Sequence, residues 1–191
     1  MGRSRKNIPV KKIKFIYCEG ESEEKYFYML NQKYNGSNIK IKNLGKGQLE
    51  FVNDVIKHHK YDKADEVYAA FDADDMNNQE IDKCFKQCSI NGINILFSNV
   101  CFEVWLLLHY EYFDMDYTRD ILYQKLEKHM KLNKYTDFKG QSYVPYLMDK
   151  VNQAIQNINK LSTSDNYNKY SNPYSTIDDR ILKKIFDTPV L

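Results

Sequence analysis

The sequence has no hydrophobic run long enough to cross a membrane. Apolar stretches such as residues 104–108 fall far short of the roughly 20 residues that a membrane-spanning helix needs. The basic start, residues 1–6, has no apolar segment behind it and so lacks the pattern of a secretory signal. It also lacks the serine or threonine that a myristoylation motif carries at position 6. These absences predict a cytoplasmic protein without a membrane partner.

Paired cysteine motifs are also absent. The four cysteines form no CxxC unit, which argues against a structural zinc site. Cys84 and Cys88 lie four residues apart on a predicted helix, where a metal is conceivable but ordinary packing of buried thiols is favoured. Cys18 and Cys101 lie in apolar segments and are predicted to be buried. Without an export signal, we expect the reducing conditions of the cytoplasm.

The composition predicts a soluble globular chain. Of the 191 residues, 42% are hydrophobic and 28% are charged, which suits one compact domain with a modest extension. The net charge of +2 says little about partners, but residues 1–12 form a basic arm. Such an arm beside an acidic site suits a phosphate-rich polymer. A frayed, solubilising tail explains the first eight residues equally well.

Alternating strand and helix patterns predict an α/β fold with a parallel sheet of about four strands flanked by helices. Ser22 is a candidate N-cap for the first helix. We expect the α/β core to span residues 13–112 and a helical C-terminal extension to span residues 113–191. The expected strands are residues 13–18, 39–41, 66–71 and 93–97, and the expected helices are residues 22–34, 48–59, 78–90, 102–110, 118–130, 142–161 and 177–185. Residues 162–173 are polar and predict an exposed loop.

Acidic and polar residues follow the ends of three predicted strands. The first strand ends at Glu19, and the third ends at Asp72, which Asp74 and Asp75 follow closely. The fourth ends at residues 98–99. Because ligands bind at the carboxyl ends of the strands in an open parallel sheet, we expect these residues to share one edge.

Glu23 joins this group through helical phase. It shares a helix face with Phe27 and Leu30, which must pack on the sheet, so its side chain should point towards Glu19. Glu21 and Glu24 fall outside that stripe and are expected in solvent.

Carboxylates held together repel one another unless a cation lies between them. Oxygen ligands alone select hard ions, here Mg²⁺ or Mn²⁺. An acidic DxDD segment by itself is often only a strand-to-helix loop, but its combination with the EGxxE turn favours a metal site. The predicted metal ligands are Glu19, Glu23, Asp72, Asp74 and Asp75.

Glu103 begins an otherwise apolar segment and therefore needs a partner. A metal or substrate ligand is favoured over a helix cap, and Ser98 and Asn99 join it as candidate substrate-binding residues. His109 lies further along the same helix, where a buried, hydrogen-bonded histidine is favoured over a catalytic one.

Three motifs resemble the RloB-like family. They are CEGESEEKYF at residues 18–27, FDADD at residues 71–75 and SNVCFEVWLLLH at residues 98–109. The family usually has proline where Val100 stands, and Tyr174 interrupts its C-terminal Asn-Pro-Ser-Thr stretch. The resemblance implies a Toprim-type fold and an association with restriction-modification and phage-abortive systems, often beside an ABC-type ATPase.

The resemblance also implies that Glu19, Asp72 and Asp74 are metal-site acids, and that Glu23 belongs to the nuclease branch of Toprim proteins. We therefore expect an endonuclease dependent on Mg²⁺ or Mn²⁺ that hydrolyses DNA or RNA, tRNA included. Its catalytic residues would be these four acids and a lysine. Lys46 and Lys139, both beside glycines, are the candidates, and the sequence does not choose between them.

Other functions share some of these residues. A topoisomerase or primase would need a further domain, for which the chain leaves little room. A haloacid-dehalogenase-type phosphatase carries its DxD after the first strand, whereas the DxD here follows the third predicted strand. The Gly45-Lys46-Gly47 loop is too short for a Walker A motif, so no NTP hydrolysis is expected. The competing hypothesis is a non-catalytic, metal-binding subunit that docks on an ABC-type ATPase or a nucleic acid.

Overall fold

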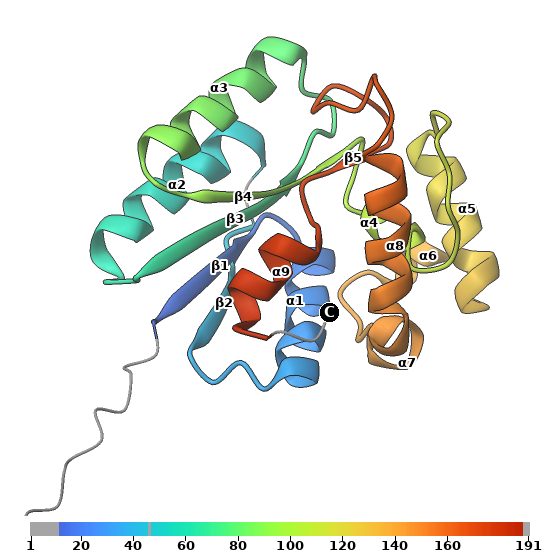
Figure 1. Ribbon diagram of the computed structural model, residues 1–191, viewed down its shortest axis with the longest axis horizontal. Helices are drawn as coiled ribbons and strands as arrows, with labels where there is room; N and C mark the ends of the chain where they lie inside the picture. Colours follow the sequence, from blue (N-terminus) through green and yellow to red (C-terminus); the bar gives the residue numbers. More distant parts are fainter. Residues whose placement is uncertain (1–11, 46, 189–191) are drawn as a thin grey trace, which may run out of the picture.

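The computed structural model describes residues 12–45 and 47–188, and these residues form a mixed α/β fold around one five-stranded sheet (Figure 1). The strand order is β2-β1-β3-β4-β5. The strands are β1 (Lys14–Cys18), β2 (Ile39–Asn43), β3 (Glu66–Asp72), β4 (Asn94–Asn99) and β5 (Tyr174–Ser175). The first four are mutually parallel, which confirms the predicted parallel sheet. β5 pairs antiparallel with β4 and was not predicted, because two residues are too few to show a periodic pattern.

Helices cover both faces of the sheet. They are α1 (Glu21–Tyr34), α2 (Gln48–Tyr61), α3 (Asn78–Ile90), α4 (Glu103–Leu107), α5 (Arg119–Met130), α6 (Tyr135–Phe138), α7 (Val144–Leu147), α8 (Val151–Leu161) and α9 (Asp179–Phe186), with a 3₁₀ turn η1 (Met148–Lys150) before α8. Figure 1 shows α2 and α3 on one side of the sheet and α1, α9 and the remaining helices on the other. No helix in the described ranges has the length and apolar character needed to cross a bilayer.

Two hydrophobic clusters result from the alternation of side chains along the strands. In β1, Phe15 and Tyr17 join the cluster under α2 and α3, whereas Ile16 and Cys18 join the cluster under α1, α4, α5, α8 and α9. β3 alternates in the same way, and its interior residues are all buried. Its near-continuous apolar run is therefore typical of a strand covered on both faces, as predicted.

Three local predictions need correction. Helix α1 begins at Glu21 with Gly20 as its N-cap, so Ser22 is not the cap. The expected helix at residues 142–161 is divided into α7, η1 and α8, and Pro145 lies in the first turn of α7, where a missing N–H is tolerated. The short helix α6 was not predicted either.

Candidate functional site

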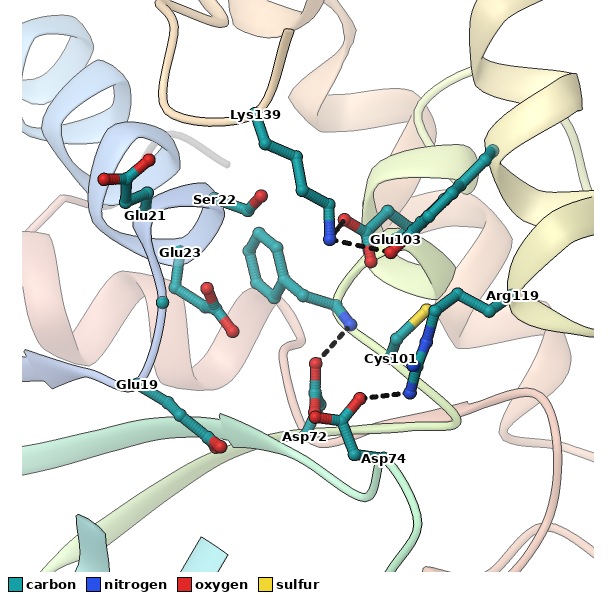
Figure 2. Close-up of a pocket in the computed structure, with 13 residues that line it drawn as sticks. Glu19, Glu21, Ser22, Glu23, Asp72, Asp74, Cys101, Glu103, Arg119 and Lys139 are labelled. Carbon is teal, nitrogen blue, oxygen red and sulfur yellow. Dashed lines mark hydrogen bonds and ion pairs between the residues drawn. The ribbon is translucent and has the colours of Figure 1, made fainter. Parts of the chain in front are cut away.

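A cavity of about 360 Å³ lies beyond the carboxyl ends of β1 and β3 (Figure 2). The first turn of α1 and the start of α4 form part of its wall, and residues from α5 and the loop after α6 complete it. Its lining residues are Glu19, Gly20, Glu21, Ser22, Glu23, Asp72, Asp74, Cys101, Phe102, Glu103, Arg119, Tyr123 and Lys139. Glu19 and Glu23 lie towards one side of the cavity, and Lys139 and Arg119 lie towards the other (Figure 2). Each of the two cations is paired with a carboxylate, Lys139 with Glu103 and Arg119 with Asp74.

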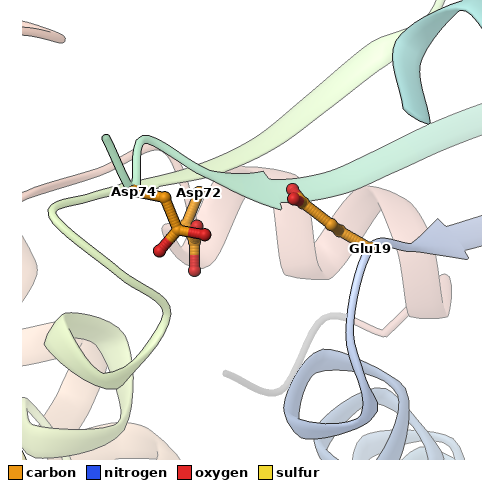
Figure 3. Close-up of side chains that lie close together, drawn as sticks. All are labelled: Glu19, Asp72 and Asp74. Carbon is orange, nitrogen blue, oxygen red and sulfur yellow. The ribbon is translucent and has the colours of Figure 1, made fainter. Parts of the chain in front are cut away.

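Three carboxylates meet at the sheet edge (Figure 3). One oxygen each from Glu19, Asp72 and Asp74 lie within 4.8 Å of one another, so together these residues could hold a metal ion. The backbone fixes two of them: the Glu19 amide donates to the Ala70 carbonyl at 2.9 Å, and the Asp74 amide donates to the Val100 carbonyl at 2.9 Å. The sequence placed all three residues at this edge, and the structure brings them together.

Asp72 has a carboxylate that is only partly satisfied by hydrogen bonds. Its Oδ2 accepts a hydrogen bond from the Phe102 amide at 3.1 Å, whereas its buried Oδ1 has no hydrogen-bond partner among the described residues. Burial, together with the charges of Glu23 and Asp74, raises the pKa of Asp72 well above its ordinary value. A cation beside this carboxylate would favour its ionised form and lower the pKa of Asp72 again.

Glu23 lies deeper, with only 4% of its surface exposed. Burial first, and then the charges of Glu103 and Glu19, raise the pKa of Glu23 to about 8, although a hydrogen bond from its own backbone N–H opposes the shift. Gly20 makes room for this side chain, since a Cβ at position 20 would lie 2.8 Å from Glu23 Oε2. The helical-phase argument that joined Glu23 to Glu19 is thus confirmed: both line the cavity.

Lys139 and the buried Glu103 form an ion pair in the cavity. Lys139 Nζ lies 3.0 Å from Glu103 Oε1 and donates to the Tyr123 hydroxyl at 2.7 Å. Burial lowers the pKa of Lys139, but the Glu103 carboxylate outweighs it and raises the pKa above its usual value, so the lysine is charged. Glu103 is the first residue of α4 and follows the N-cap Phe102, so it is not the helix cap, and its carboxylate pairs with Lys139.

Gly140 allows the loop that carries Lys139 to approach α1. Its φ of +79° is in the left-handed region, and a Cβ there would lie 2.3 Å from Glu21 Oε2. Glu21 is exposed at this contact and Glu24 is half-buried, so only Glu21 is as solvent-accessible as expected.

Sequence reasoning missed Arg119, which lines the cavity and forms an ion pair with Asp74 (Figure 2). Tyr123 was also missed and lies one turn further along α5. Thr118 offered a local signal, because its side chain caps α5 by accepting from the Ile121 amide at 3.4 Å. The cap predicts where the helix begins, but nothing local predicts that its first residue reaches a carboxylate 45 positions away in the chain.

Several predicted site residues lie elsewhere. Asp75 is exposed and does not line this cavity. Ser98 is buried within β4, where its hydroxyl donates to Ser175 Oγ at 3.3 Å, and Asn99 donates to the Lys169 carbonyl at 3.4 Å. Neither lines the cavity. Lys46 and residues 1–11 of the basic arm lie outside the described residues.

Two further predictions concern buried groups. His109 is 1% exposed, and its ring nitrogens hydrogen-bond with the Tyr26 hydroxyl at 3.1 Å and the Trp105 carbonyl at 3.0 Å. It is the satisfied, buried histidine that the sequence predicted. The four cysteines are free, buried thiols, also as predicted.

The fold and the cavity define an α/β protein with a carboxylate-rich site at the carboxyl edge of a parallel sheet. The family model described as RloB-like protein matches residues 14–183, so the chain belongs to the RloB-like family. That match confirms the resemblance of the three motifs. Neither the search of curated proteins nor the search of solved structures found a match.

Proposed function

We propose that this protein is a Toprim-type nuclease that hydrolyses phosphodiester bonds of DNA or RNA with Mg²⁺ or Mn²⁺. The observation that carries the proposal is the convergence of Glu19, Asp72 and Asp74 within 4.8 Å at the sheet edge. Glu23 and Lys139 line the same cavity as these three acids. Carboxylates that bind a metal and a cation that binds a phosphate are the two requirements of such a reaction.

The residues fit a hard divalent cation. The donors are all carboxylate oxygens, which favour Mg²⁺ or Mn²⁺ over softer metals. The buried Asp72 Oδ1 has no hydrogen-bond partner among the described residues, and burial and then the charges of Glu23 and Asp74 disfavour the ionised form of Asp72. Glu19, Asp72 and Asp74 would hold the metal, and Glu23 would complete the set or hold a second ion.

When bound, the metal would polarise the scissile phosphate and lower the pKa of a water molecule. The chain's own residues would bind and orient the substrate. Lys139 is held in place by Glu103 and Tyr123, so its ammonium would offset charge that develops on the phosphate. Its position supports Lys139 as the catalytic lysine.

The biological setting of this activity is proposed from family membership. Restriction-associated or anti-phage defence, and an ABC-type ATPase as a partner, follow from what the RloB-like resemblance implies. The alternative remains a non-catalytic subunit whose metal site stabilises the fold or a docking surface.

A cleavage assay separates these two functions. The purified protein is incubated with plasmid, single-stranded DNA and tRNA in Mg²⁺ or Mn²⁺, alone and with an ABC-type ATPase, the proposed partner. We expect metal-dependent cleavage that Asp72→Asn abolishes. Asp149→Asn, an exposed acid on η1 outside the cavity, removes the same charge and should leave cleavage unchanged. Absence of cleavage under every condition would favour the non-catalytic subunit.

A further inference from the structure

Arg119 occupies a position that the proposed chemistry does not yet use. It is the first residue of α5, it lines the cavity, and its guanidinium Nη2 contacts Asp74 Oδ1 (Figure 2). Asp74 is one of the three clustered carboxylates. The arginine therefore neutralises a carboxylate that a metal would also need.

The Arg119–Asp74 pair is easily exchanged. The two side chains are 36% and 38% exposed, and ion pairs with this much solvent around them are weak. A divalent cation would carry twice the charge of a guanidinium and would interact with all three carboxylates at once. We therefore expect the cation to displace Arg119 from Asp74.

The Lys139–Glu103 pair behaves differently. Lys139 is as exposed as Arg119, at 37% against 36%, but its partner Glu103 has a side chain only 2% exposed, and Lys139 also donates to Tyr123. Removing the lysine would leave a buried charge without a partner, which costs far more than breaking an exposed pair. Lys139 is thus a fixed cation of the cavity, and Arg119 is an exchangeable one.

The unused donors of Arg119 indicate what the released side chain would bind. Its Nε is buried and has no hydrogen-bond partner among the described residues. Nε and Nη2 form the edge of a guanidinium that grips a phosphate or carboxylate through two parallel hydrogen bonds. Asp74 uses only the Nη2 side of this edge, and the start of α5 adds the positive end of a helix dipole nearby.

We propose that Arg119 is an exchangeable counter-ion that holds Asp74 while the metal is absent and binds a phosphate of the nucleic acid once the metal has taken Asp74. The phosphate would lie between Arg119 and Lys139 on the cationic side of the cavity. This inference rests on the proposed function for its metal and its ligand class, but it is tested without measuring cleavage.

The first arm of the test measures binding of Mn²⁺ alone, by electron paramagnetic resonance, to the full chain and to Arg119→Met. Removing the competing guanidinium should tighten Mn²⁺ binding roughly two- to fivefold, the range expected for loss of a weak ion pair. Arg180→Met is the matched control, because it breaks an Arg180–Asp178 pair outside the cavity, and it should change nothing. Unchanged or weaker Mn²⁺ binding in Arg119→Met would overturn the proposal that the metal displaces Arg119 from Asp74.

The second arm measures binding of fluorescent single-stranded DNA and RNA octamers, in Ca²⁺ to suppress cleavage and in EDTA. In Ca²⁺, Arg119→Met should bind the preferred octamer roughly tenfold more weakly. The slope of log affinity against log salt should fall by about 0.7, the value for one phosphate contact on a single strand. In EDTA the difference between the two proteins should be clearly smaller, because Asp74 then competes with the phosphate for the arginine.

The outcomes distinguish this inference from the proposed function. An equal loss of affinity in Ca²⁺ and EDTA would reduce Arg119 to a general surface charge and would overturn the proposal. Failure of the unmodified protein to bind Mn²⁺ would refute the metal site itself, and with it both ideas. If Mn²⁺ affinity and octamer affinity change as expected but no cleavage is seen, the proposed role of Arg119 stands and only the nuclease activity is refuted.

Discussion

At the scale of single residues, burial keeps the Glu23 carboxyl largely protonated near neutral pH when no metal is bound. Its pKa is raised from 4.5 to about 8, first by burial and then by neighbouring carboxylates. The folded state therefore binds more protons than the unfolded chain between these values, and the stability of the metal-free protein must fall as pH rises through this window. A divalent cation favours the ionised form and reverses the trend.

This linkage predicts the melting temperature as a function of pH. In EDTA, the protein should melt at lower temperature at pH 8.5 than at pH 6, and Glu23→Gln should flatten the decline. In Mg²⁺, stabilisation should grow over the same range, because metal binding releases protons. Differential scanning calorimetry with and without Mg²⁺ measures both effects. A metal-induced shift independent of pH would show that Glu23 is not coupled to the metal.

His109 makes stability depend on pH in the opposite direction from Glu23. Burial lowers its pKa from 6.5 to about 4, even though the backbone carbonyl of Trp105 favours the charged form. Between these pH values the unfolded chain binds a proton at His109 and the folded protein does not. The free energy of unfolding therefore decreases as pH falls from 6.5 towards 4.

We predict that this effect of His109 lowers the free energy of unfolding by roughly 3 kcal/mol over this pH range. His109→Gln should be less stable than the unmodified protein at pH 7 but should lose less stability between pH 6.5 and pH 4. Urea denaturation at several pH values gives the two free energies of unfolding. Parallel curves for the two proteins would contradict the assignment.

At the scale of elements, Lys14 ties the C-terminal helix to the sheet. It lies on β1 with 1% of its surface exposed, and its ammonium donates to the Ile185 carbonyl at 2.9 Å and to Asp187 at 2.6 Å. It also donates to the Lys184 carbonyl. The last carbonyls of α9 have no partners within the helix, so the lysine acts as a C-cap supplied by a distant strand.

Replacing Lys14 by methionine should therefore destabilise the protein by roughly 2–4 kcal/mol, because carbonyls that it now satisfies lose their donor. Lys12→Met is the matched control: its side chain is 63% exposed in an ion pair with Glu66, and we expect a much smaller loss of stability than for Lys14→Met. Guanidinium denaturation measures both variants. Equal losses would mean that Lys14 does not cap α9.

At the scale of the whole molecule, the C-terminal segment that follows residue 112 completes the core of the α/β unit. Side chains from α5, α8 and α9 belong to the same buried cluster as Ile16 of β1 and Trp105 of α4. The cavity is likewise built from both parts, since Arg119, Tyr123 and Lys139 follow residue 112. Neither the core nor the cavity is complete without the C-terminal segment.

We therefore predict a single cooperative unfolding transition. The chain contains one tryptophan, Trp105, which is fully buried in the shared cluster and so reports on it by fluorescence. Its transition should coincide with the loss of helix measured by circular dichroism. Two separated transitions would indicate that the C-terminal segment unfolds independently.

The sequence by itself determined the four parallel strands of the sheet and the acids at its edge. Hydrophobic periodicity is a local property, and parallel strands bring their carboxyl ends together, so Glu19, Asp72 and Asp74 were predictable neighbours. Helical phase added Glu23 for the same reason. Asp75 was grouped with them because proximity in sequence does not say which way a loop side chain points.

Only the tertiary structure decided which cations face those acids. Arg119 reaches Asp74, and Lys139 reaches Glu103, across long separations in the chain that depend on how α5 and the loop after α6 pack against α1 and α4. Strand β5 depends on the same packing, since two residues pair with β4 only when the chain returns to its edge. Such contacts leave no periodic signal, because they are set by the packing of distant elements and not by the order of neighbouring residues.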